Sequence, residues 1–407
     1  MDRGASISKL HLVRAVGTLG TAIVAFGGLG GGALPVVPGP WPEVWGMVGG
    51  SAVALVGVGV LVAAWLWLGR LVGTGSRAAA NGVTPRDMVT TLLLWAAPLI
   101  LTAPLFSQDI YSYLAQGAIV RHGFDPYWGG PVDLLGPLNP LAKNVPAIWA
   151  HSPSPYGPVA LAAAAAISRA TGDAIFTAVV AHRTISLLGV LAAAWASVHL
   201  GRRLGVGGPS ALWLGICNPL AILHLIGGIH NEALMLGFLL VGLEIGCRGL
   251  ERLRVPGAAA QGWALFLCSG ALISCAGLVK VTGFIGLGFM GMALARELAV
   301  GNRLRARSAA PAIAAAAAIQ SAVLGATATV ASIASGVGFG WAFVQGGAAQ
   351  IRSWLSLTTS VGLIAGQLSE SLGFGDTTDS AIAIARGTGA TIAVFCQVVV
   401  GHFGSVF

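Results

Sequence analysis

The sequence predicts an all-α protein, built as a polytopic bundle of transmembrane helices. Its composition gives the first two reasons: 56% of the 407 residues are hydrophobic and only 9% are charged, with a mean hydropathy of +0.83. Soluble domains carry about 25% charged residues, so this chain has too few polar groups to cover itself in water. Its 60 glycines favour close helix packing in a membrane. We expect residues 1–407 to form a single integral membrane domain.

The third reason is a series of about ten apolar runs that match, or nearly match, a hydrocarbon core of about 30 Å. Two more runs, 157–168 and 355–368, are too short to count as spans and are interpreted as interfacial or re-entrant helices. No clear cleavage site follows the basic N-terminus, so the first run is interpreted as a retained span. The predicted spans are 13–32, 47–69, 88–106, 176–200, 209–227, 232–247, 259–279, 281–296, 309–336 and 379–401.

The basic residues predict the orientation of these spans. With a cytoplasmic N-terminus and ten alternating spans, 15 of the 22 Lys and Arg residues fall in cytoplasmic segments, which is the positive-inside pattern. Counting 157–168 as a span would move Arg202 and Arg203 outside. Topology thus explains the net charge of +8, and no nucleic-acid partner is needed. The five cysteines lie in or beside apolar runs without metal-binding spacing and are interpreted as buried thiols.

Two longer segments are predicted on the outer side. The external loop 107–175 is rich in Pro, Trp and Tyr near its start, which favours an ordered loop that follows the membrane surface. The second external stretch is 337–377. Because a simple anchor needs no such loops, both indicate a function on the outer face.

Asp109 is the leading candidate for chemistry. It is the first carboxylate after the third apolar run, and the chain contains only 14 acidic residues. An ionisable group at a membrane boundary is a functional candidate. The alternative is structural, since Ser107 or Asp109 could cap a helix from Ile110 to Val120. Asp125 is interpreted mainly as a turn residue.

Two other polar motifs are predicted on the same face. In 151–158, three prolines forbid regular helix before Tyr156, and this segment forms either a rigid turn or the wall of a groove facing Asp109. His230, Asn231 and Glu232 interrupt an apolar hairpin. They form either a site or a turn in which Asn231 caps the next helix.

Three cations could bind a phosphate group. Lys280 splits an apolar stretch at an outer turn, where it could also extend harmlessly to the interface. An ammonium group is a good point-charge partner for phosphate. Arg183 and Arg352 are weaker candidates.

Four stretches carry a family resemblance. The runs SQDIYSYLAQGAIVRHGFDPY, SPSPYGPVAL and ALWLGICNPLAILHLIGGIHNEALMLG, with the lysine of GLVKVTG, resemble the actinobacterial polyprenol-phosphomannose-dependent α-(1→6)-mannopyranosyltransferases. This family belongs to the GT-C glycosyltransferases. The resemblance covers roughly residues 10–400 and favours the branch that elongates the α-1,6-mannan backbone of lipomannan and lipoarabinomannan.

The resemblance implies a GT-C-like fold in the plasma membrane, with Asp109 as the catalytic carboxylate at the outer face. The donor would be polyprenyl-phosphomannose and the acceptor a mannan lipoglycan. Within this assignment, Tyr111, Tyr113, Tyr156 and the His230–Glu232 triplet are expected to bind substrate, and the three cations to bind the donor phosphate. One carboxylate base suffices for direct displacement with inversion. No DxD or DD motif accompanies Asp109, so no cofactor or obligatory metal is expected, although a divalent metal is not excluded.

Two alternatives remain open at this stage. A lipid-linked sugar transporter or flippase would favour mid-membrane charges and repeated halves, and neither is evident in the sequence. The chain also ends soon after its last predicted span, whereas members of the resembling family extend further. A truncated, inactive relative is the second alternative.

Overall fold

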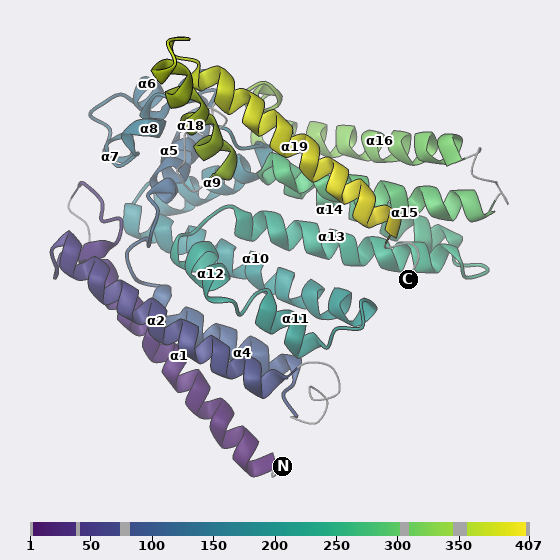
Figure 1. Cartoon of the computed structure of the whole chain (residues 1–407), viewed down its shortest axis with the longest axis horizontal. Coiled ribbons are helices and arrows are strands. Elements are labelled where there is room, and N and C mark those ends of the chain that lie inside the picture. Colours follow the sequence, from purple (N-terminus) through teal and green to yellow (C-terminus); the bar gives the residue numbers. More distant parts are fainter. Residues whose placement is uncertain (1–2, 38–40, 74–81, 302–308, 345–355, 404–407) are drawn as a thin grey trace. The chain divides into compact units, whose positions relative to one another are not determined.

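The computed structural model describes residues 3–37, 41–73, 82–301, 309–344 and 356–403. Every regular element in these ranges is helical, which confirms the predicted all-α class. The chain divides into two compact units, 1–344 and 345–407. Figure 1 shows the helices of both units with their labels.

Seven predicted spans are helices long and apolar enough to cross a membrane. Large apolar side chains such as Leu55, Val330 and Ile333 are exposed along them, as expected for surfaces that face lipid. The chain is therefore a multi-pass membrane protein. The seven spans contain α1 (Arg3–Gly31), α2 (Met47–Val72), α10 (Ile175–Arg203), α13 (Glu232–Leu253), α14 (Ala259–Val279), α15 (Ile285–Gly301) with the preceding 3₁₀ turn η3 (Val281–Phe284), and α16 (Ala309–Ser335).

The third predicted span, 88–106, is wrong as a continuous helix. The structure has a 12-residue helix, α4 (Pro85–Ala96), followed by a 3₁₀ turn, η1 (Ala97–Leu99). Pro98 has no N–H for an α-helical hydrogen bond, and the chain beyond Leu99 runs without helix to Gln108. The carbonyl groups of this irregular segment are therefore free to accept bonds from elsewhere.

The fifth predicted span, 209–227, is also broken. It consists of α11 (Gly208–Leu214), α12 (Pro219–Ala221) and a π-helical turn, η2 (Ile222–Gly227), with a bend of 59° between its halves. Pro219 again removes a backbone donor, and the Asn218 side chain caps the restart by accepting from Leu220 N at 2.8 Å. If this bent pair counts as one span, the described residues contain up to eight.

Short helices fill the segment 107–175. They are α5 (Asp109–Arg121), α6 (Pro131–Leu135), α7 (Pro140–Lys143), α8 (Ala147–Ala150) and α9 (Pro158–Thr171). Apart from Gly157, which precedes it, the run 157–168 lies in the 14-residue α9, which is shorter than a full span. Gly117 lets α5 approach α9, because a Cβ there would lie 2.4 Å from the Ala164 carbonyl oxygen. The outer position of this segment and its orientation parallel to the membrane stay predictions.

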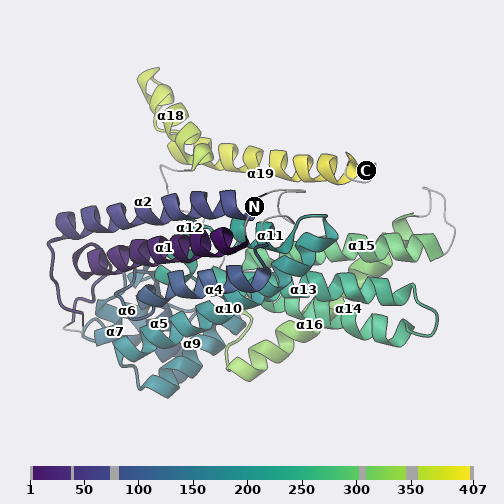
Figure 2. The ribbon, with the colours of Figure 1, turned by 90° about the horizontal axis from the view of Figure 1, so that it is seen from below.

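Glycines allow close contact between neighbouring spans in the first unit. Helices α1 and α2 lie side by side in Figures 1 and 2, and a Cβ on Gly27 would lie 2.4 Å from Ala54 N. Helix α13 packs against both α10 and α14. In the second unit, α18 (Leu357–Ser371) packs on α19 (Thr378–Phe403) through Gly362. These helices contain the predicted short run 355–368, apart from its start, and the predicted tenth span.

Candidate active site

Asp109 and His230 are neighbours in the structure. Asp109 follows the irregular segment after Leu99, and His230 follows the broken span 209–227. Asp109 is the first residue of α5, and His230 lies two residues before α13. His230 Nδ1 lies 3.6 Å from Asp109 Oδ2, with the two side chains 11% and 33% exposed. Residues that are 121 positions apart in the sequence are thus neighbours in space.

The Asp109 carboxylate does not cap its own helix. Gln108 occupies the N-cap position of α5 and makes no side-chain cap bond, while the Asp109 N–H donates to Ser107 Oγ at 3.1 Å. The capping interpretation of Asp109 is therefore wrong, and its carboxylate is free to act on a ligand. Asp125 is a turn residue as expected, since its Oδ1 accepts from Tyr127 N at 2.9 Å.

Glu232 and Lys280 form the second charged pair of the site. Glu232 begins α13, Lys280 follows the last residue of α14, and the Lys280 ammonium donates to Glu232 Oε1. Lys280 is 38% exposed and Glu232 is 23% exposed. Their ion pair gives the Lys280 ammonium a defined partner, which simple extension to the interface does not require. Glu232 Oε2 is buried without a hydrogen-bond partner among the described residues. This oxygen is an open acceptor.

Two tyrosines line the same region. The Tyr156 hydroxyl donates to the Tyr113 hydroxyl at 3.4 Å, and their rings meet edge to face at 5.2 Å. Burial raises the pKa of both phenols, and the negative charges of Asp109 and Glu232 add to this effect. Both hydroxyls therefore stay protonated. The segment before α9 is non-helical as predicted, and Gly157 lets it approach the end of α14, where a Cβ would lie 2.2 Å from the Leu278 carbonyl oxygen.

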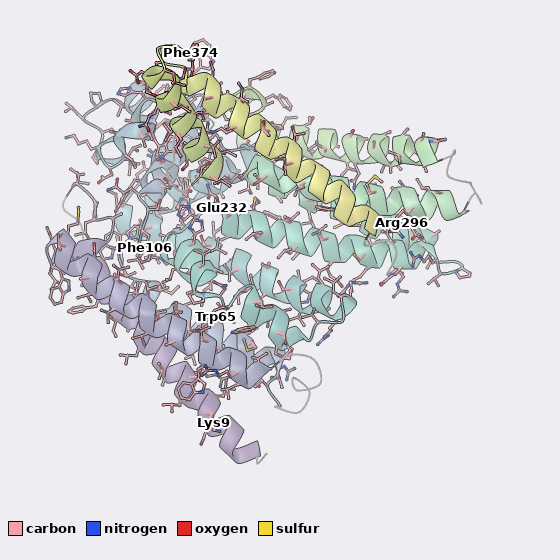
Figure 3. All side chains as sticks on the ribbon, viewed as in Figure 1. Lys9, Trp65, Phe106, Glu232, Arg296 and Phe374 are labelled. Atoms are coloured by element: carbon pink, nitrogen blue, oxygen red, sulfur yellow. The ribbon has the colours of Figure 1, made fainter. Side chains whose placement is uncertain are left out.

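Strained backbone precedes both Asp109 and His230. Phe106 has φ of 61° and Ile229 has φ of 58°, a conformation that side chains rarely adopt, least of all β-branched ones. Such strain costs of order 1–3 kcal/mol per residue and concentrates at functional sites. The two turns are joined by Leu105 N, which donates to the Gly227 carbonyl at 3.1 Å. Figure 3 labels Phe106 in the first of these turns and Glu232 at the start of α13.

The comparisons with known proteins assign the family. Residues 14–296 match the model described as "Alpha-(1->6)-mannopyranosyltransferase, N-terminal domain". The chain is 50% identical to alpha-(1->6)-mannopyranosyltransferase B of Corynebacterium glutamicum, over 95% of this chain and 65% of that protein. The chain belongs to the alpha-(1->6)-mannopyranosyltransferase family.

Two further relatives agree with this assignment. A probable alpha-(1->6)-mannopyranosyltransferase of Mycolicibacterium smegmatis is 38% identical, over 95% of this chain and 70% of the relative. Alpha-(1->6)-mannopyranosyltransferase A of Mycobacterium tuberculosis is 36% identical, over 84% of this chain and 63% of that protein. The chain thus spans about two thirds of the length of these mannopyranosyltransferases. No solved structure matches the chain significantly.

Arg183 has a different role in this family member from the predicted one. Its side chain is fully buried in α10. The guanidinium donates to five backbone carbonyls, which belong to Ile100, Thr102, Ala103, Ile226 and Gly227, at 2.8–3.5 Å. A donor phosphate could not reach it, so its assignment as a phosphate ligand is corrected. Arg183 instead fixes the segments that lead to Asp109 and His230.

The other predicted site residues differ in their surroundings. Tyr111 is 2% exposed and donates its hydroxyl to the Ala33 carbonyl at 2.6 Å, so its predicted substrate contact is corrected to a structural one. Asn231 occupies the N-cap position of α13 without a side-chain cap bond, so the capping alternative is wrong. Its predicted contact with substrate stays a prediction. Arg352 lies outside the described residues.

His224 belongs to the site and was missed in the sequence. Its ring stacks on that of His230 with centroids 3.8 Å apart. It lies on the π-helical turn η2, a rare conformation that often occurs at functional sites. The pKa of His230 is lowered by burial and then by the nearby His224, so His230 is neutral near pH 7.

The same groups could also be metal ligands. Three possible ligand atoms, one each from His224, His230 and Glu232, lie within 4.8 Å of one another. Two imidazoles with a carboxylate suit zinc. Glu232, however, is already paired with the Lys280 ammonium, whose charge would repel a metal ion. The donor set therefore fits a metal poorly, and metal independence stays a prediction.

Proposed function

We propose that the chain transfers mannose from polyprenyl-phosphomannose to the 6-hydroxyl of an α-1,6-mannan acceptor at the outer face of the plasma membrane. The observation that carries this proposal is the Asp109 carboxylate, which does not cap its helix and is one-third exposed. It lies beside His230, and the ion pair of Lys280 and Glu232 belongs to the same site. Membership of the mannopyranosyltransferase family supports the reaction class. The elongating role follows the family resemblance.

The proposed reaction is one direct displacement. Asp109 accepts the proton of the acceptor 6-hydroxyl as its oxygen forms a bond to C1 of mannose. The bond between C1 and the phosphate oxygen breaks, and its electron pair leaves with the polyprenyl phosphate. A β-linked donor thereby gives an α-linked product. No second carboxylate is needed as a nucleophile.

The neighbouring groups would support this step. The neutral His230 would position the Asp109 carboxylate, and the protonated hydroxyls of Tyr113 and Tyr156 would bind sugar hydroxyls. The Lys280 ammonium would stabilise the charge that develops on the departing phosphate. Glu232 would hold Lys280 in place through their ion pair.

Lys280→Ala is expected to raise the KM for the donor about ten-fold or more, whereas Lys280→Arg keeps most donor use. The expectation rests on losing one charge-assisted contact, worth roughly 1.5–3 kcal/mol. Steady-state kinetics with varied donor measures the effect. The matched control is Lys143→Ala, because Lys143 is an exposed lysine at the end of α7.

A double variant separates phosphate binding from the loss of the ion pair. Lys280→Ala leaves the Glu232 carboxylate without its cation, and Lys280→Ala with Glu232→Gln removes that unpaired charge. We expect the high donor KM to persist in the double variant. Recovery of a near-normal KM would instead show that Lys280 only neutralises Glu232.

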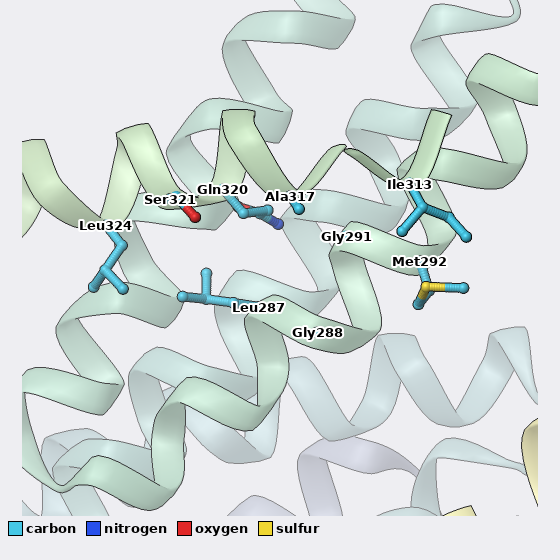
Figure 4. Close-up of a pocket in the computed structure, with 9 residues that line it drawn as sticks. All are labelled: Leu287, Gly288, Gly291, Met292, Ile313, Ala317, Gln320, Ser321 and Leu324. Carbon is cyan, nitrogen blue, oxygen red and sulfur yellow. The ribbon is translucent and has the colours of Figure 1, made fainter. Parts of the chain in front are cut away.

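An apolar cavity near Lys280 could receive the polyprenyl chain of the donor. It has a volume of about 290 Å³ and lies between α15 and α16. Figure 4 shows Leu287, Met292 and Leu324 among its lining residues, with the buried side chain of Gln320. Its first lining residue follows Lys280 by seven positions. A phosphate at Lys280 would therefore hold its lipid close in the chain to the residues that line this cavity.

Gly288→Leu is expected to fill this cavity without disturbing the fold. A Cβ at Gly288 would meet nothing within 4 Å, and leucine favours helix by about 1 kcal/mol over glycine. We expect a several-fold higher KM for a long-chain polyprenyl donor and little change for a short-chain analogue. Gly325→Leu on α16 is the control, because Gly325 is equally open and does not line the cavity. An equal effect on both donors would exclude a chain-binding role.

A cell-free assay tests the function itself. Purified protein would receive polyprenyl-phosphomannose and a synthetic α-1,6-dimannoside, and the expected product is an α-1,6-trimannoside. A flippase would move the labelled lipid between liposome leaflets without forming this product. Lipid movement without a trimannoside would refute the proposed transfer.

A further inference from the structure

A large cavity lies between α4 and α10, apart from the candidate active site. Its volume is about 1020 Å³. On α10 the cavity is lined by residues between Leu191 and Arg202. Arg183 of the same helix binds the segments that lead to the candidate active site. Arg183 and Arg202 are 19 residues apart on one helix, which corresponds to about 28 Å at 1.5 Å per residue. The basic end of this cavity therefore lies far along α10 from Arg183 and from the segments of the candidate site that Arg183 holds.

The cavity combines an apolar wall with a basic rim. Leu191, Trp195 and Val198 give the wall on α10, which is a candidate membrane span. Arg86 of α4 and Arg202 in the last turn of α10 supply charge from two separate helices. An apolar surface that ends in arginines is the arrangement expected where hydrocarbon meets lipid headgroups, and tryptophan is enriched at the same depth.

The two arginines of the rim have no carboxylate partner among the described residues, whereas their neighbours are paired. Arg14 binds Asp87, and Arg203 binds Glu244 and Glu251. The cavity is lined by no acidic residue. Its positive charge is therefore available to a bound anion.

We infer that this cavity binds an anionic phospholipid, with the phosphate at Arg86 and Arg202 and an acyl chain along the wall on α10. Basic pockets between transmembrane helices are suited to such headgroups. A soluble phosphate would use the arginines but not the apolar wall. The inference does not depend on the proposed mannosyl transfer.

Native mass spectrometry of the delipidated full chain tests this site with dioleoylphosphatidylglycerol and dioleoylphosphatidylcholine. We expect the wild type to prefer phosphatidylglycerol. Arg86→Gln with Arg202→Gln should weaken phosphatidylglycerol binding about ten-fold or more, since each basic residue at a membrane surface contributes roughly a five-fold factor. Phosphatidylcholine binding should change little.

Two further variants make the result specific. Arg70→Gln with Arg252→Gln removes the same charge from exposed positions outside the cavity and should leave the preference intact. Thr90→Trp keeps both arginines but adds bulk to an exposed lining residue, and it should weaken lipid binding. An unchanged preference in the Arg86/Arg202 variant would overturn the inference. Equal loss in the Arg70/Arg252 variant, or full displacement of lipid by equimolar glycerol phosphate, would also overturn it.

Discussion

Arg183→Met is expected to abolish or severely reduce the yield of folded protein. The substitution removes the donor that five backbone carbonyls share, of which the Gly227 carbonyl still accepts from Leu105 N. Each buried carbonyl left unsatisfied costs about 1–3 kcal/mol. Their sum is comparable to the total stability of many proteins, about 5–15 kcal/mol. Yield of monodisperse protein and Tm in detergent measure the loss.

Two variants show whether the loss reflects backbone support. Arg183→Lys keeps the charge but not the planar set of donors, so we expect it to remain clearly less stable than the wild type. Arg169→Met is the control, because Arg169 is an exposed arginine in the last turn of α9. A stable Arg183→Met protein with a weakened donor affinity would contradict the structural role and restore Arg183 as a phosphate ligand.

Hydropathy predicted the long helices well because it measures transfer into lipid, and seven of the ten predicted spans are present as such helices. It failed at 88–106 and 209–227 because it ignores hydrogen bonding. Pro98 and Pro219 remove backbone donors, which an average of hydropathy over a long run does not record. Both breaks lead into the candidate site, so the irregular backbone of the site was not predicted from hydropathy.

Topology predicted the grouping of Asp109, His230, Glu232 and Lys280, because it assigned all four to one membrane face. It could not distinguish a ligand-binding cation from a buried one. Arg183 was misassigned because the carbonyls that it binds lie 80–83 residues before it and 43–44 residues after it, and no pattern in the sequence records such contacts.

His224 was missed for a related reason. It lies within an apolar run that was interpreted as a continuous span, whereas the structure breaks this run at Pro219 and stacks the His224 ring on His230. A histidine inside a proline-containing apolar run was the available signal. Tyr111 illustrates the opposite error. It was predicted to bind substrate, but its hydroxyl donates to the Ala33 carbonyl.

Asp109→Asn is expected to lower mannosyl transfer by about 10²-fold or more at a normal protein level. Asparagine keeps the size of the side chain, and the carboxylate makes no cap bond that stability requires. The amide cannot accept the proton of the acceptor hydroxyl, so a general base is lost. Asp125→Asn is the matched control, because its Oδ1 can still accept from Tyr127 N, and we expect it to cost much less.

The most direct test of the proposed site is the single-turnover rate of mannosyl transfer by Asp109→Asn, measured with saturating polyprenyl-phosphomannose and α-1,6-dimannoside. Saturation removes any difference in substrate binding, so the rate reports the chemical step. Our account predicts a rate about 10²-fold or more below that of both the wild type and Asp125→Asn, with the same Tm. A near-normal rate in a folded Asp109→Asn protein would contradict it. Glu232, whose Oε2 has no hydrogen-bond partner in the part of the chain that the structure describes, would then be the base to test next.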